Sequence, residues 1–110
     1  MLPQHLRLRR SAEFTSVVKR GKKFVRPTMV AYALESASPR FGVIVGKAVG
    51  GAVERNSVKR RLRHLAAGLL GSSSAIAVVV RARPAAAGNA KGLAQDFQDV
   101  WQRAQRSVVS

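Results

Sequence analysis

The segment 52–70, AVERNSVKRRLRHLAAGLL, carries side chains that could bind a polyanion. At helical spacing, one flank of it would hold Asn56, Lys59, Arg60 and Arg63. Arg55 falls near the apolar side, where its stem can pack while its guanidinium stays in water. A single acid, Glu54, accompanies five Lys or Arg residues, whereas an ordinary surface helix interleaves the two signs. A plain solvated face is the competing interpretation, but the missing acids favour a phosphate-binding helix.

The same helix needs an apolar side that anchors it in a core. Apolar residues recur at i, i+4, i+7, i+8 and i+11, namely Val58, Leu62, Leu65, Ala66 and Leu69. We therefore expect a helix that is buried along one side and basic along the other. Arg61 is expected to project to a different side of this helix from Ser57.

The overall charge also indicates a nucleic-acid partner. The 20 Lys and Arg residues against 5 Asp and Glu leave a formal net charge of +15 on 110 residues, which is tolerable with a polyanionic partner. Fourteen of these cations are Arg, whose planar fork binds phosphate and can stack on bases. The composition therefore favours structured nucleic acid over a merely attractive charged surface.

Catalytic and metal-binding patterns are missing from the sequence. The five carboxylates are scattered along it, at Glu13, Glu35, Glu54, Asp96 and Asp99. This spacing lacks the clustering of a two-metal nuclease site, and both histidines, His5 and His64, are isolated. The absence of cysteine excludes thiolate metal sites and disulfide partners. We expect no catalytic residue and no metal ligand in the protein, so any chemistry would reside in a partner.

Hydrophobic patterning predicts an α/β (α+β) two-layer sandwich, with about four strands and three helices in the order α-β-β-β-α-β-α. The elements expected around the basic helix are a helix over 12–20, extended segments over 23–26, 28–34 and 40–47, a strand over 75–80 and a final helix. The uninterrupted apolar run 75–80 indicates a central strand covered on both faces. The final helix has an apolar side made of Leu93, Phe97, Val100, Trp101 and Ala104. Trp101 is therefore expected in the core rather than as a base-stacking platform.

The chain is expected to form one nucleic-acid-binding domain over residues 1–110, and the resemblance described below makes RNA the expected ligand. Residues 1–10 are interpreted as a flexible basic arm that carries Arg7, Arg9 and Arg10, and 84–92 as a small-residue linker to the final helix. No apolar run approaches the ~20 residues of a membrane span, and nothing resembles a secretory signal. We expect a cytoplasmic protein with no membrane partner, because the lack of cysteine also fits a reducing compartment.

The run KAVGGAVERNSVKRRLRHL, with RLRRSAEF before it and AVVVRARPAA after it, resembles the protein subunit of bacterial ribonuclease P. The resemblance covers residues 6–87 and a final helix. Its signature is a glycine-led entry into a basic helix, carried here by Gly50, Ala52, Val53, Arg55, Asn56, Lys59, Arg60 and Arg63. One position departs, since the family usually has Arg where this chain has Ser57.

This resemblance implies a ribonucleoprotein whose catalytic RNA, with Mg²⁺ bound mainly by the RNA, cleaves the 5′ leader from precursor tRNA. The motif helix would face the catalytic RNA, and the fold would include a left-handed crossover between the strands that flank it. A cleft between the first helix and the sheet would receive the single-stranded leader, with Phe14, Val18, Tyr32 and Lys47 as the matching residues. Val18 should stack more weakly than an aromatic residue. For Phe14 a plain core role stays open, as does an ordinary strand-end role for Lys47.

Two other classes stay open on charge and size. A small non-catalytic RNA-binding protein, such as a ribosomal component, is the main alternative. A DNA-compacting module is disfavoured, because the sequence has no long basic tail and no helix-turn-helix pattern. A preference for precursor over mature tRNA would separate the ribonuclease P subunit from the first alternative.

Overall fold

The computed structural model describes residues 7–8, 11–36, 39–70 and 76–108. Its helices and strands are α1 (Ser11–Arg20), β1 (Lys22–Val25), β2 (Met29–Glu35), β3 (Arg40–Ile44), α2 (Ala52–Leu70), β4 (Ile76–Ala82) and α3 (Ala90–Val108). Two short 3-10 helices, η2 (Lys47–Val49) and η3 (Pro84–Ala86), precede α2 and α3. The predicted order α-β-β-β-α-β-α is confirmed.

The four strands form one mixed sheet in the order β1-β2-β4-β3. β2 pairs antiparallel with both β1 and β4, while β3 pairs parallel with β4. β4 therefore lies inside the sheet, as its apolar run predicted. α2 connects the two parallel strands, and the left hand of that crossover stays a prediction.

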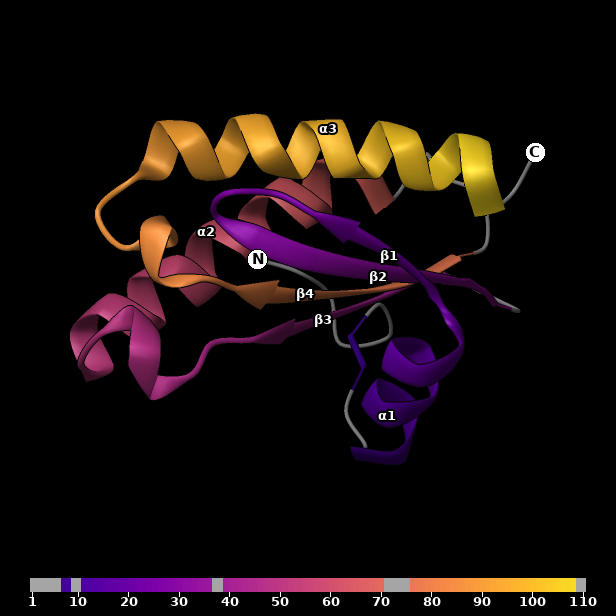
Figure 1. The fold of residues 1–110 in the computed structure, drawn as a ribbon, viewed down its shortest axis with the longest axis horizontal. Helices are drawn as coiled ribbons and strands as arrows, with labels where there is room; N and C mark the ends of the chain where they lie inside the picture. The colour runs from indigo at the N-terminus through magenta and orange to yellow at the C-terminus, as the bar shows by residue number, and fades with distance from the viewer. Residues whose placement is uncertain (1–6, 9–10, 37–38, 71–75, 109–110) are drawn as a thin grey trace.

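Helices lie on both faces of the sheet (Figure 1). Alternate residues of β4 belong to different apolar clusters: Val78 and Val80 pack with α2 and α3, while Ala77 and Val79 pack with α1. This two-sided burial explains the continuous apolar run. The sheet with α2 and α3 forms the expected sandwich, and the short α1 covers part of the opposite face.

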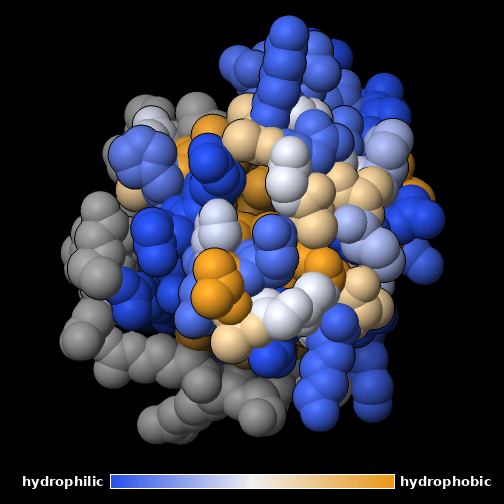
Figure 2. All heavy atoms as spheres, turned by 90° about the vertical axis from the view of Figure 1, so that its left-hand side faces the viewer, coloured by the Kyte–Doolittle hydropathy of each residue, from blue (hydrophilic) through white to orange (hydrophobic). Residues whose placement is uncertain are grey.

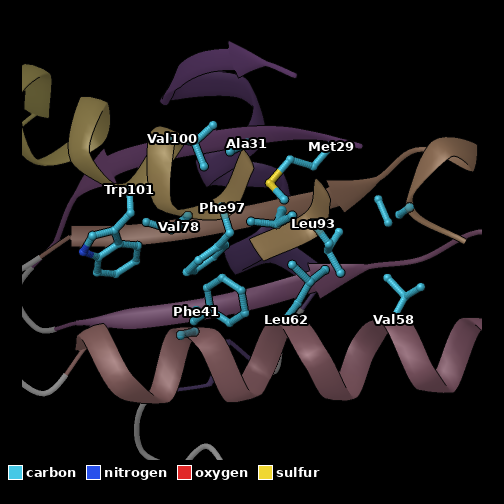
Figure 3. Packing of buried hydrophobic residues seen from close by; sticks show 14 of the residues in the cluster. Met29, Ala31, Phe41, Val58, Leu62, Val78, Leu93, Phe97, Val100 and Trp101 are labelled. Atoms are coloured by element: carbon cyan, nitrogen blue, oxygen red, sulfur yellow. The ribbon is translucent and has the colours of Figure 1, made fainter. Parts of the chain in front are cut away.

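The larger core lies between the sheet and the two long helices (Figure 3). The Phe97 ring packs edge-on against Phe41 at 5.8 Å and stacks with Trp101 at 5.7 Å, both measured between ring centroids. Trp101 is 5% exposed, so its predicted core role is confirmed. Leu62 of α2 is fully buried in the same cluster, as its place in the apolar stripe predicted.

Two connections are more structured than the sequence suggested. β3 ends at Ile44 and not at Lys47, because the chain turns into η2, where Val49 is buried and its N–H donates to the Gly46 carbonyl at 3.1 Å. The predicted linker 84–92 contains η3, and α3 begins within it at Ala90. The Asn89 side chain caps that helix, since its Oδ1 accepts a hydrogen bond from the Gly92 N–H at 3.1 Å.

Part of the expected basic arm belongs to the fold. Leu8 is buried, and its N–H donates to the Phe41 carbonyl at 2.9 Å. Arg7 forms a parallel bridge with Phe41. The interpretation of residues 1–10 as a flexible arm is therefore wrong for these two residues, and Arg9 and Arg10 lie outside the described residues.

Candidate nucleic-acid interface

The buried apolar side of α2 fixes the rotation of this helix about its own axis. Val58, Leu62 and Ala66 are buried against the sheet and α3. At the start of the helix, Gly50 adopts a φ of 151°, a conformation that side-chain-bearing residues rarely adopt. A Cβ there would also lie 3.0 Å from Cβ of Glu54. Glycine is thus required where the chain turns from η2 into the basic helix.

A hollow beside α2 gathers most of the motif residues, and we call it the α2 hollow. Its lining consists of Arg7, Asn56, Lys59, Arg60, Arg63 and His64. No carboxylate lines it, and neither Lys59, Arg60 nor Arg63 forms an ion pair with any described acid. Four of the five predicted motif residues therefore meet at one concave surface, and Arg7 joins them from before α1.

Arg55 is the predicted motif residue that does not line this hollow. Its side chain is half-buried, and its Nε is enclosed without a hydrogen-bond partner in the described structure. The side chain packs as expected, but the Nε of its guanidinium is enclosed and does not stay in water as the sequence predicted. Substitution of Arg55 would therefore disturb packing as well as charge, which makes it a poor probe of phosphate binding.

The prediction that Arg61 and Ser57 project to different sides of α2 is wrong. The two residues are one turn apart, and both line a second hollow together with Arg60, His64 and Leu65 of α2 and Ala90 and Ala94 of α3. We call it the α2–α3 groove. Residues at i and i+4 are neighbours on a helix, so the spacing alone could have found this pair.

The end of the molecule where α2 and α3 begin has a strongly polar surface. In the view of that end, hydrophilic side chains surround a smaller apolar centre (Figure 2). Val53, a motif residue in the first turn of α2, is apolar but is nevertheless 84% exposed.

On the face of the sheet that points away from α2 and α3, strand pairing brings together residues that are far apart in the sequence. One row across the strands is Val25–Val30–Arg81–Ile44, and the next is Lys23–Tyr32–Val79–Gly42. We call these two rows the open sheet face. Arg81 and Lys23 are exposed, and Val25 is 54% exposed, so α1 does not cover the outer part of this face.

α1 borders the open sheet face with the two side chains predicted for the leader cleft. Phe14 and Val18 are half-buried and pack against the same apolar cluster as Tyr32. The Phe14 ring lies over Gly42, where an added Cβ would be 2.5 Å from its Cε2. Partial exposure of Phe14 is compatible with both of its proposed roles, core and cleft.

The other two predicted cleft residues fit less well. Tyr32 is 7% exposed, so little of its ring is available for stacking. Lys47 is exposed but lies in η2, beyond the end of β3, and not in either row of the open sheet face. Lys23 and Arg81, which sequence reasoning missed, are the cations on this face, and only the strand register could have found them.

Two of the carboxylates have structural partners. Oδ2 of Asp96 accepts hydrogen bonds from the Thr28 N–H at 3.0 Å and the Thr28 hydroxyl at 2.7 Å, which ties the turn before β2 to α3. Asp99 pairs with Arg26 and, at 3.0 Å, with Arg103. Within the described ranges, no three His, Asp or Glu side chains gather closely enough to hold a metal ion. Nor is any helix of those ranges long and apolar enough to span a membrane.

Comparison with known proteins gives a consistent result. The family model Ribonuclease P matches residues 2–105. The ribonuclease P protein component of Mycobacterium avium is 42% identical over 112 residues, covering 94% of this chain and 94% of that relative. That of Streptomyces avermitilis is 47% identical over 119 residues, with 94% of each chain covered.

Solved structures agree with this result. The ribonuclease P protein of Staphylococcus aureus superposes with a TM-score of 0.83 at 25% identity, over 91% of this chain and 95% of that chain. The ribonuclease P protein of Thermotoga maritima has a TM-score of 0.73 at 22% identity, over 91% and 96% of the two chains, and shows a shared fold. The chain belongs to the family of bacterial protein components of ribonuclease P, a tRNA-processing endoribonuclease.

Proposed function

We propose that this chain is the protein subunit that binds the catalytic RNA of ribonuclease P through α2 and the 5′ leader of precursor tRNA through the open sheet face. The α2 hollow carries the proposal, because it combines cations from α2 and Arg7 on a concave surface with no carboxylate among its described lining residues. A surface of this kind is suited to a phosphate backbone.

RNA binding at the α2 hollow would relieve a cost that the free protein bears. Lys59, Arg60 and Arg63 lie on one side of a single helix, without an ion pair to a described acid. Mutual repulsion among them disfavours the free state, and each phosphate they neutralise releases a counterion. Asn56 in the same hollow adds an amide that can donate to a phosphate oxygen or accept from a ribose hydroxyl.

The open sheet face has the chemistry of a single-strand site. Val25, Val30 and Ile44 offer partly exposed apolar surface, with Phe14 beside them on α1. Lys23 and Arg81 add one cation in each row. Apolar or aromatic side chains can contact the bases of a single strand, while cations bind its phosphate backbone. Such a surface binds single strands without strict sequence readout, as a leader of variable sequence requires.

The hydrolytic chemistry is assigned to the RNA. Among the described residues no three metal-ligating side chains gather at one place, and Asp96 and Asp99 are engaged with Thr28 and with Arg26 and Arg103. We therefore assign Mg²⁺ to the RNA, and the protein lowers the repulsion that this RNA must overcome when it folds and binds substrate. The protein's contribution should be largest when Mg²⁺ is scarce.

The test is cleavage of a precursor tRNA by a bacterial ribonuclease P RNA at limiting Mg²⁺, with and without the protein. We expect strong stimulation, and tighter binding of the leader-bearing substrate than of a leaderless tRNA. Arg60→Ala should reduce the stimulation at limiting Mg²⁺ and leave it nearly intact at high Mg²⁺. Tight RNA binding with neither stimulation nor leader preference would contradict the proposal and favour a general RNA-binding protein.

A further inference from the structure

We propose that the α2–α3 groove is a second RNA-backbone contact, with Arg61 as its phosphate-binding residue. The proposal extends the proposed function, since it takes the same RNA as the partner, but it assigns a surface and a residue outside the α2 hollow. It rests on the position and surroundings of Arg61.

The groove and the α2 hollow adjoin each other on α2 and share part of their lining. Arg60 and His64 line both concave surfaces. On one side of this shared ridge lie Lys59 and Arg63, and on the other lies Arg61. A strand bound in the α2 hollow that continues over the ridge would meet Arg61 next.

Arg61 itself is available for such a contact. Its side chain is exposed and forms no ion pair with a described acid. The opposite wall of the groove is made by Ala90 and Ala94, whose short side chains leave a backbone room to approach. Among the described residues, no carboxylate lines the groove itself, so an anion there meets Arg60 and Arg61. The nearest acid on this side of α2 is Glu54, which lines the adjoining hollow that shares Ser57 and Arg61 with the groove.

A structural role for Arg61 is less consistent with these surroundings. An arginine that stabilised the α2–α3 contact would be expected to bond a carboxylate or a carbonyl of α3, as Arg103 bonds Asp99 within α3. Among the described residues, no hydrogen bond or ion pair of Arg61 side-chain atoms links the two helices. Its charge is therefore left for a partner outside the chain.

Ser57 provides an internal check on the geometry. It lines the same groove one turn before Arg61 and is half-buried there. A guanidinium placed at Ser57 would reach the same groove from the neighbouring turn. Ser57→Arg should therefore compensate for the loss of Arg61.

The experiment measures the affinity of the full chain for a bacterial ribonuclease P RNA as a function of salt. Arg61→Ala should weaken binding about tenfold at moderate salt, as expected for one lost charged contact. It should also reduce the steepness of log affinity against log salt by ~0.7 to 0.9, the value for one phosphate. Arg61→Lys should keep the slope, and Ser57→Arg combined with Arg61→Ala should restore it.

Arg106→Ala is the matched control, because Arg106 is also exposed but lies in the last turn of α3, and α3 starts at the groove. It should leave both affinity and slope unchanged. If wild type binds the RNA but Arg61→Ala behaves like Arg106→Ala, the groove proposal alone is overturned. If Ser57→Arg fails to restore the slope, the phosphate does not lie in the groove. A wild-type protein that does not bind this RNA would overturn both proposals.

Discussion

The basic side of α2 and the open sheet face differ in how they are built. The residues of the α2 hollow come almost entirely from two turns of one helix, between Asn56 and His64. The open sheet face is assembled from four strands, with Lys23 and Arg81 brought onto it only by the pairing register. A helix displays its chemistry within a short sequence, whereas a sheet face becomes visible only when strand order is known.

The two regions also differ in the forces they can offer to RNA. The α2 hollow is lined by cations and polar groups, so binding there should depend steeply on salt. The open sheet face is mostly apolar, with Val25, Val30 and Ile44 around its two cations, so base contacts should contribute more. Substitutions in the two regions are therefore expected to change different measured quantities.

The largest effect is expected from Lys59→Ala combined with Arg63→Ala. Both side chains line the α2 hollow, and loss of two charged contacts should cost ~3 to 6 kcal/mol, a weakening of about a hundredfold or more in affinity for ribonuclease P RNA. Salt titration of RNA binding checks this, and the slope should fall by ~1.4 to 1.8. An unchanged preference for leader-bearing over leaderless tRNA, measured on the residual complex, would support separate roles for the two regions. If the preference for leader-bearing tRNA fell as much as the affinity for ribonuclease P RNA, separate roles for the two regions would be contradicted.

Leu62→Ala tests whether α2 must be held rigidly. Leu62 lies on the buried side of α2, and its side chain is fully buried in the cluster that α2 shares with the sheet and α3. Its truncation should lower the free energy of unfolding by ~2 to 5 kcal/mol, measured by urea denaturation. At a temperature where the variant is still folded, RNA binding at α2 should weaken more than leader preference, because the open sheet face packs on a different cluster. A larger loss of leader preference than of RNA binding at α2 would contradict the proposed independence of the two regions.

The sequence predicted the contiguous features well. The apolar stripes of α2 and α3, the central position of β4 and the core role of Trp101 all follow from periodicity within one element. The positions of Arg7 in the lining of the α2 hollow and of Arg81 next to Val30 do not follow from such periodicity. They depend on pairing between distant segments. The end of β3 was also misplaced, since the burial of Val49 in η2 is a tertiary effect.

Gly42→Ala is aimed at the open sheet face. The new methyl group would lie 2.5 Å from the Phe14 ring and 3.1 Å from Leu8 Cδ1, so the ring must move away from the sheet. Overpacking of this kind should cost ~1 to 3 kcal/mol of stability. Preference for the leader-bearing substrate should fall, while the salt slope of RNA binding at α2 stays as in wild type. Gly46→Ala is a suitable control, because a Cβ there meets nothing within 4 Å. A Gly42→Ala variant with full leader preference would remove Phe14 from the proposed site.

The smallest effect is expected from Arg103→Ala, which removes a cation that already has an acid partner. Arg103 pairs with Asp99 four residues earlier on α3, and both side chains are substantially exposed. Exposed pairs of this kind contribute ~0.2 to 1 kcal/mol, so thermal denaturation should show only a slight loss of stability. The salt slope of RNA binding should not change, although the protein has lost the same charge as in Arg60→Ala. A reduced slope would mean that net charge, and not the placement of unpaired cations around α2, determines RNA affinity.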